Sequence, residues 1–224
     1  IRKEKLAKTS VVQRFRQEIR AASQLSHPNI VLALDADEVN GIHYFAMEYI
    51  EGVDLGRLVQ EKGPLPVIVA CDYIRQVAAA LQHAWEQGLV HRDVKPSNIL
   101  VTPKGKVKLL DLGLAHLATL SQSDQETRIT QEGIVLGTPD FVAPEQWQNP
   151  LTVSCQADVY SLGGTLYFLL SGRVPFEGET AAEKLVRHVT MPPPSVRTVR
   201  PDIPEELDSY IRWMMAKKPE DRPQ

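Results

Sequence analysis

Three polar side chains, at positions 93, 98 and 111, have the types and the order that phosphoryl transfer requires. Asp93 and Asn98 lie in the string His-Arg-Asp-Val-Lys-Pro-Ser-Asn (residues 91–98), and Asp111 follows Asp93 by 18 positions. A carboxylate can orient a hydroxyl group and accept its proton. Carboxylate and amide oxygens are ligands that Mg²⁺ accepts. The pattern therefore predicts a site that activates a hydroxyl group beside a metal-bound phosphate.

The elements around these residues are predicted from spacing and turn signals. Apolar positions recur with helical spacing over residues 11–25, and His27-Pro28 ends that helix. Strands are predicted over residues 30–34 and 42–47, because Asn40-Gly41 between them is a typical hairpin turn. A long amphipathic helix is predicted over residues 67–89.

The second half of the chain reads as mainly helical. A short β-rich stretch, residues 99–110, follows the polar string, and residues 115–136 have neither helical nor strand periodicity, which predicts a loop. Helices are predicted after Pro144, including an apolar core helix from Val159 to Leu170 and a last helix over residues 202–218. These elements give an α+β fold with a small β-containing front section and a larger helical body.

Composition narrows the classes of function. The chain has 224 residues, 43% apolar and 24% charged, which is enough for one domain or for one domain with two lobes. A net charge of −3 disfavours nucleic-acid binding, and Cys71 and Cys155 form no disulfide framework. No signal peptide opens the chain, and the apolar helix at 159–170 is too short to cross a bilayer. We expect a cytoplasmic location, with a membrane anchor outside these residues left open.

The string at 91–98, followed by Asp111-Leu112-Gly113, resembles the catalytic loop and metal-binding motif of eukaryotic-type (Hanks-type) Ser/Thr protein kinases. The sequences of residues 137–146 and 218–224 resemble those of bacterial members of that family. Leu112 stands where the family usually has Phe. The resemblance implies a two-lobed protein-kinase-like fold. Its parts would be a partial N-lobe (1–47), a hinge (48–54) and a C-lobe (55–224) with an activation segment at 111–145.

The resemblance implies a role for each catalytic residue. Asp93 would accept the proton of the acceptor hydroxyl, and Lys95 would neutralise charge on the transferring phosphate. Asn98 and Asp111 would hold Mg²⁺, or Mn²⁺ in its place. Glu18 would pair with the phosphate-holding lysine of the third strand, although a charged residue on an amphipathic helix is usually just part of its solvated face.

The nucleotide site follows from the segment Met47-Glu48-Tyr49-Ile50-Glu51-Gly52, which resembles the kinase hinge. Backbone groups of Glu48 and Ile50 would pair with the adenine edge of ATP, and Met47 would guard the inner pocket. Asp54 would reach the ribose, and Leu100 would form the apolar floor under the base. By composition alone the segment is a strand followed by a glycine turn.

Residues 137–145 (Gly-Thr-Pro-Asp-Phe-Val-Ala-Pro-Glu) resemble the substrate-docking end of the activation segment. The resemblance implies that Thr138 bonds Asp93 and Lys95, that Glu145 pairs with Arg222, and that Asp158 braces the backbone near His91. Arg92, beside the catalytic aspartate, is a candidate ligand for a phosphorylated loop residue. Thr130 is the first candidate for that phosphosite and Thr127 the second.

The resemblance implies a protein serine/threonine kinase that takes ATP and protein substrates and forms dimers for autophosphorylation. One rival is a pseudokinase that signals by binding. Another is a small-molecule phosphotransferase, a class that lacks the segment ending Ala143-Pro144-Glu145. The strand lysine and the glycine-rich loop of the family would lie upstream of Ile1. We therefore expect residues 1–224 by themselves to bind ATP poorly and to be inactive, with an exposed strand edge over residues 30–47.

Overall fold

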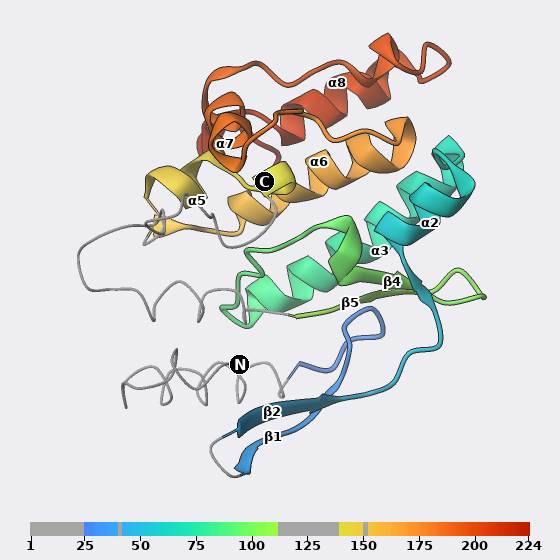
Figure 1. The fold of residues 1–224 in the computed structure, drawn as a ribbon, viewed down its shortest axis with the longest axis vertical. Coiled ribbons are helices and arrows are strands. Elements are labelled where there is room, and N and C mark those ends of the chain that lie inside the picture. Colours follow the sequence, from blue (N-terminus) through green and yellow to red (C-terminus); the bar gives the residue numbers. More distant parts are fainter. Residues whose placement is uncertain (1–24, 40–41, 112–138, 150–151) are drawn as a thin grey trace.

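The computed structural model describes residues 25–39, 42–111, 139–149 and 152–224. A two-stranded sheet lies at one end of the molecule and a group of helices at the other, with a second small sheet and a long helix between them (Figure 1). The predicted helix at 11–25, except for its last residue Leu25, and the predicted loop at 115–136 lie outside the described residues.

The first sheet is an antiparallel pair of strands, β1 (Ala33–Val39) and β2 (Ile42–Met47). The predicted hairpin is therefore confirmed, but its first strand spans residues 33–39 and not the predicted 30–34. Ile30 is buried and forms an isolated parallel bridge with Leu109 instead of belonging to β1. Its burial explains the error, because an apolar residue anchored in the core looks like the start of a strand.

The second sheet carries the polar string and the segment before Asp111. Its strands are β3 (Val53–Asp54), β4 (Ile99–Val101) and β5 (Val107–Leu109), in the order β3-β4-β5 and antiparallel throughout. Alternate residues of β4 and β5 are buried, including Ile99 and Leu109, which face each other in register. The pairing places the two polar motifs at the same end of the sheet, since one precedes β4 and the other follows β5.

Two helices support this sheet. The short helix α2 (Leu55–Lys62) follows β3, and the long helix α3 (Val67–Glu86) packs against β5. One face of α3 is buried at helical spacing: Ala70, Ile74, Val77, Ala80 and Ala84. The helix ends three residues before the predicted Leu89, because Gly88 takes a left-handed conformation (φ 76°) that closes the last turn.

The helical end of the molecule is built around α6 (Gln156–Ser171), which is buried on nearly every side. Around it lie α5 (Pro144–Gln148), α7 (Ala181–Thr190) and α8 (Glu205–Met214), with the single turns η3 (Pro139–Phe141), η5 (Val196–Thr198) and η6 (Pro219–Asp221). The single turn η2 (Pro96–Asn98) lies against α2 and β3 instead. The last helix is shorter than predicted. It starts after Pro204 and stops at Met214, and Pro219 opens the separate turn η6.

No helix among the described residues has both the length and the apolar character needed to span a bilayer.

Candidate active site

The loop at 91–95 is held from below by one buried carboxylate. Asp158, in the first turn of α6, accepts hydrogen bonds from the backbone N–H groups of His91 (2.9 Å) and Arg92 (2.7 Å). Arg92 has φ 66°, a left-handed conformation that costs a non-glycine residue about 1–3 kcal/mol. On its other side, the Arg92 carbonyl accepts a bond from the Gln146 side chain (2.7 Å). The strained conformation is therefore fixed from two helices, as the predicted bracing role of Asp158 requires.

Burial acts strongly on the Asp158 carboxylate. Its side chain is almost fully enclosed, and this burial raises its pKa, while the electrostatic effect of His91, the two backbone donors and Arg92 act in the opposite direction. Each oxygen of the buried carboxylate thus accepts a backbone N–H bond, and together the two bonds hold the loop in place.

The side chain of His91 joins the two polar motifs. It is fully buried, and its Nε2 lies 2.7 Å from the carbonyl oxygen of Leu110, the residue before Asp111. The other ring nitrogen, Nδ1, accepts a hydrogen bond from the backbone N–H of Asp93 (3.2 Å). His91 therefore has a structural role: its two ring nitrogens connect the backbone of Asp93 to the residue before Asp111.

Asp93, Lys95 and Asn98 form one hydrogen-bonded cluster. The Lys95 ammonium group lies 2.9 Å from Oδ1 and 2.7 Å from Oδ2 of Asp93. The Asn98 amide nitrogen donates to the backbone carbonyl of Asp93 and to its Oδ2, both at 2.9 Å. These bonds orient the Asp93 carboxylate. Its side chain is still 34% exposed, which leaves it accessible from outside.

Asn98 and Asp111 are brought together by the backbone. The N–H of Leu110 donates to the carbonyl of Asn98 (2.9 Å), so Asp111 is the next residue after this contact. Asp111 is exposed and has φ 55°, a left-handed conformation that aspartate tolerates better than most residues. The structure thus turns the chain sharply where the second motif begins.

The donor set fits a hard divalent cation. The amide nitrogen of Asn98 donates both of its hydrogen bonds to Asp93, so the amide oxygen is the side-chain atom that can bind a metal. With the Asp111 carboxylate this makes two oxygen ligands, the number that the protein usually gives to Mg²⁺ when phosphates and water complete the shell. Among the described residues there is no group of three or more His, Cys, Asp or Glu side chains that would form an all-protein metal cage.

Glu48 connects the segment that resembles the hinge to Leu32, the residue before β1, and to β5. Its carboxylate accepts a bond from the Leu32 N–H (2.9 Å) and forms an ion pair with Lys108 of β5. The Glu48 N–H donates to the Leu32 carbonyl (3.0 Å). The side-chain bonds of Glu48 lower the pKa of its carboxyl group against the opposing effect of burial. Met47 and Ile50, on either side, are 37% exposed and half-buried.

Asp54 and Leu100 face each other across the pairing of β3 with β4. Leu100 is half-buried, which suits an apolar floor. Asp54 has a structural task that the sequence analysis did not foresee, because its Oδ1 accepts the N–H of Arg57 (2.9 Å) and caps α2.

The Arg92 side chain contains a buried donor with no partner among the described residues. This atom, Nη1, is enclosed and makes no hydrogen bond within that part of the chain. A buried guanidinium nitrogen without an acceptor is costly, so it is a candidate anion contact.

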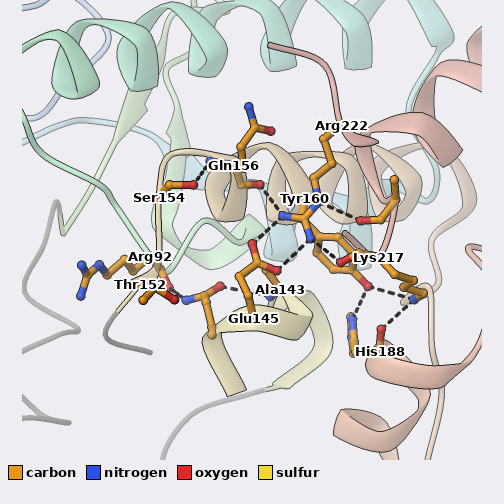
Figure 2. A network of polar contacts seen from close by, with 12 residues as sticks. Arg92, Ala143, Glu145, Thr152, Ser154, Gln156, Tyr160, His188, Lys217 and Arg222 are labelled. Carbon is orange, nitrogen blue, oxygen red and sulfur yellow. Dashed lines mark hydrogen bonds and ion pairs between the residues drawn. The ribbon is translucent and has the colours of Figure 1, made fainter. Parts of the chain in front are cut away.

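Behind the loop lies a buried ion pair, as predicted for Glu145 and Arg222. The two side chains meet in a bidentate contact of 2.6 and 2.8 Å (Figure 2). The remaining donors of Arg222 bond the carbonyl oxygens of Ala216, Gln156 and Lys217 at 2.8, 2.7 and 3.0 Å. All five donors of the guanidinium group are thus satisfied.

Next to this pair lies a polar network that the sequence analysis missed. His188 of α7 is fully buried, with Nδ1 2.8 Å from the hydroxyl of Tyr160 (Figure 2). Lys217 donates to the His188 carbonyl (2.7 Å) and lies over the ring of Phe176, 4.4 Å from its centroid. Burial and then Arg222 lower the pKa of Lys217 to about 8. These contacts join residues that are far apart in the sequence, so no motif or residue spacing predicts them.

His188 makes stability depend on pH. Burial, and then the charges of Lys217 and Lys184, lower its pKa from 6.5 to about 4, and the Asp140 backbone acts in the opposite direction. Nε2 is buried and has no hydrogen-bond partner among the described residues. The unfolded chain takes up this proton near pH 6.5 and the folded chain only near pH 4. Stability from this group is therefore complete above pH 6.5 and lost as the pH falls toward 4, by at most about 3 kcal/mol.

The expected measurement is the free energy of unfolding, from urea titrations between pH 7 and pH 4, for the parent and for His188→Gln. The variant should be less stable at pH 7 but should lose less stability on acidification. Equal losses in the two proteins would show that His188 is not the group that titrates.

Four of the predicted site residues, Glu18, Thr127, Thr130 and Thr138, lie outside the described residues. The others gather in two places. Asp93, Lys95, Asn98 and Asp111 lie around the ends of β4 and β5, and the hinge residues lie along the connection from β2 to β3.

The chain resembles known proteins over its whole length. The model for the protein kinase domain matches residues 1–224. The serine/threonine-protein kinase PrkC of Bacillus subtilis is 38% identical over 208 residues, and Pkn1 of Myxococcus xanthus is 42% identical over 216. These matches cover 93% and 95% of the chain, but 31% and 30% of the two relatives. The chain thus spans about a third of the length of these relatives.

Solved structures agree with this fold. The kinase domain of PknI from Mycobacterium tuberculosis superimposes with a TM-score of 0.76 and 27% identity, covering 99% of this chain and 77% of that one. Rad53 1–466, solved with AMP-PNP, gives a TM-score of 0.77 at 27% identity, covering 96% and 52% of the two chains. The predicted α+β protein-kinase-like fold is confirmed. This chain, whose two polar motifs lie at adjoining strand ends, belongs to the protein kinase domain family.

Proposed function

We propose that the protein is a serine/threonine kinase that transfers the γ-phosphate of ATP to Ser or Thr hydroxyl groups of proteins. One observation carries the proposal: the Asp93 carboxylate is oriented by Lys95 and Asn98 and yet stays open on one side. Asp158, which holds the backbone of the same loop, is by contrast buried. The names of the relatives, all serine/threonine kinases, support the same activity.

In this proposal Asp93 accepts a hydrogen bond from the acceptor hydroxyl and takes its proton as the new P–O bond forms. The bonds from Lys95 and Asn98 hold the carboxylate in one orientation, which lowers the entropic cost of reaching a reactive geometry. Lys95, which contacts the same carboxylate, brings a positive charge to the place where the transferring phosphate would pass.

A divalent cation, Mg²⁺ or Mn²⁺, would be held by the Asn98 amide oxygen and the Asp111 carboxylate. When bound, it would neutralise charge on the phosphates of the nucleotide. The structural contribution of the chain is the backbone bond between Leu110 and Asn98, which keeps the two ligands adjacent.

The nucleotide base would lie along the segment 48–54. Because the Glu48 N–H is already bonded to Leu32, its carbonyl is the group left to accept a bond from the adenine amino group, with the Ile50 N–H as the neighbouring donor. Met47 and Leu100 would enclose the base. Asp54 would reach the ribose with the oxygen that does not cap α2. Glu18 would orient a phosphate-holding lysine of the intact protein.

We further propose a two-lobed division, with residues 1–47, 48–54 and 55–224 as partial N-lobe, hinge and C-lobe, and residues 111–145 as activation segment. The domain would work in the cytoplasm and dimerise for autophosphorylation. In the segment, Thr138 would bond Asp93 and Lys95 once the substrate-docking end is ordered.

Phosphorylation of Thr130, or of Thr127, is the proposed activating event. The buried Nη1 atom of Arg92 has no acceptor within the described part of the chain, and a phosphate group would supply one. In the intact, active protein, phosphopeptide mapping should find phosphate on one of these threonines. Thr130→Ala should lower kcat, because the phosphate that would bond Arg92 can no longer be added. Mapping that finds no phosphate between residues 115 and 136 would reject the idea.

The proposed function is tested with the intact protein, γ-labelled ATP, Mg²⁺ and a mixed protein substrate. The expected result is label on serine and threonine, identified by mass spectrometry of the acceptor. ATP binding without any transfer would favour the pseudokinase, and label on a small molecule alone would favour the other rival class.

A further inference from the structure

One ion pair connects the turn before α5 with the helix α7 and is not explained by the reaction. Lys184 lies 2.6 Å from the carboxylate of Asp140, which belongs to η3, 44 positions earlier. Both side chains are largely enclosed, with 22% of Lys184 and 10% of Asp140 exposed. A pair that is this shielded is screened less by salt than the exposed pairs of the helix surfaces.

The fold makes room for this contact. A Cβ atom added at Gly178 would lie 3.0 Å from Cγ of Lys184, so any larger residue there would push the lysine side chain aside. Thr180 caps α7 by accepting the Glu183 N–H (3.1 Å), which fixes the first turn just before Lys184. One turn later, the buried His188 anchors α7 to Tyr160. Lys184 is thus held in place from both sides.

The turn that carries Asp140 adjoins the proposed acceptor site. Following η3, the N–H of Ala143 donates to the Gln146 side chain (3.1 Å), and Gln146 donates in turn to the carbonyl of Arg92, the residue before Asp93. A peptide that brings its hydroxyl to Asp93 extends about 3.3 Å per residue. Residues a few positions from the acceptor are therefore within reach of this turn.

Beside a bound peptide, the charge of Asp140 would affect which flanking residues are accepted. An unpaired carboxylate beside a bound peptide favours basic residues and repels acidic ones, whereas a carboxylate paired with lysine does neither strongly. His188, one titratable group packed near this pair, is neutral at pH 7 because burial, then the charge of Lys217 and finally that of Lys184 lower its pKa to about 4. Lys217, which bonds the His188 carbonyl, is a further cation in this region, and Lys184 is the cation that contacts Asp140 directly.

We infer that Lys184 is a specificity-determining residue: by neutralising Asp140, it lets the protein accept Ser/Thr peptides with neutral or acidic residues at the flanking position nearest η3. Lys184 acts through Asp140 and does not touch the reacting atoms, so it is a positioning residue. The inference rests on the proposed kinase function.

The test uses the intact protein and peptide libraries in which each position flanking the acceptor is varied in turn between Lys, Gln and Glu. Lys184→Met should leave Asp140 unpaired and raise the kcat/KM ratio of Lys to Glu peptides at one flanking position by about fivefold, the equivalent of about 1 kcal/mol. Asp140→Asn leaves the lysine unpaired and should shift the same ratio in the opposite direction.

Two further variants control for a merely structural role. The double variant Lys184→Met/Asp140→Asn has neither charge and should return the Lys/Glu ratio to that of the parent. Lys184→Arg keeps the ion pair and should also keep the ratio. Damage to the fold would instead lower the rates for all peptides together, and thermal unfolding of each variant measures that damage directly.

The outcomes separate the two proposals. A parent protein that phosphorylates no peptide overturns both the proposed function and the inference. A parent that is active, with single variants whose Lys/Glu ratios stay within twofold of it or shift in the same direction, overturns the inference and leaves the kinase function intact. Opposite shifts in the single variants with recovery in the double variant support it.

Discussion

Replacing Asp93 by Asn is expected to lower kcat for phosphoryl transfer by a factor of about 10²–10⁴, the usual contribution of a positioned general base. The amide has nearly the shape of the carboxylate but cannot accept the proton of a hydroxyl group. The loop itself should persist, because Asp158 and Gln146 hold its backbone without using the Asp93 side chain. The effect should therefore fall on kcat and leave the fold unchanged.

The measurement is steady-state phosphorylation of a protein substrate by the intact protein, together with its affinity for ATP. Asp93→Asn should retain ATP binding, whereas Asp111→Ala should lose both transfer and metal-dependent nucleotide binding. Asp221→Asn makes the same chemical change at an exposed carboxylate of η6 and should behave as the parent. Full activity of Asp93→Asn would rule out the proposed mechanism.

The chemistry of the site was predictable from the sequence because its residues lie close together along the chain. Asp93, Lys95 and Asn98 contact one another within six positions, so their order alone carries the information. The strand pairing that brings Asp111 to them is also local, since β4 and β5 form a hairpin. Long-range bracing by Asp158 and Arg222 could be expected only through the resemblance to a family, because each partner is 60 or more positions away.

Other features left no readable signal. Lys184 and Asp140 look like two ordinary surface charges in the sequence, and their pairing depends on how α7 is seated. His188 is one of six histidines, and its burial follows from the packing of Tyr160 and Phe176 around it. The predicted start of β1 differs from the structure for the same reason: Ile30 is an apolar residue buried against β5, and periodicity does not distinguish such a residue from the first residue of a strand.

The ion pair between Glu145 and Arg222 should be the most sensitive single point for stability among the described residues. Glu145→Gln keeps the shape of the side chain but leaves the guanidinium charge uncompensated where the Arg222 side chain is completely buried. Removing one partner of a buried pair costs about 3–5 kcal/mol. Chemical denaturation of the parent and the variant at pH 7 measures this difference, and a loss below about 1 kcal/mol would contradict it.

Two companion variants separate charge from hydrogen bonding at this site. Arg222→Lys keeps the charge, but a single ammonium group has three donors and cannot serve Glu145 together with the carbonyl oxygens of Ala216, Gln156 and Lys217. The double change Glu145→Leu/Arg222→Met removes both charges yet leaves those three carbonyls without their donor, at about 1–3 kcal/mol each if they stay buried. Both variants should therefore remain less stable than the parent. Full recovery in the double variant would mean that the ion pair contributes through its charges alone, and that the carbonyl contacts which connect α6 to the segment before η6 add nothing.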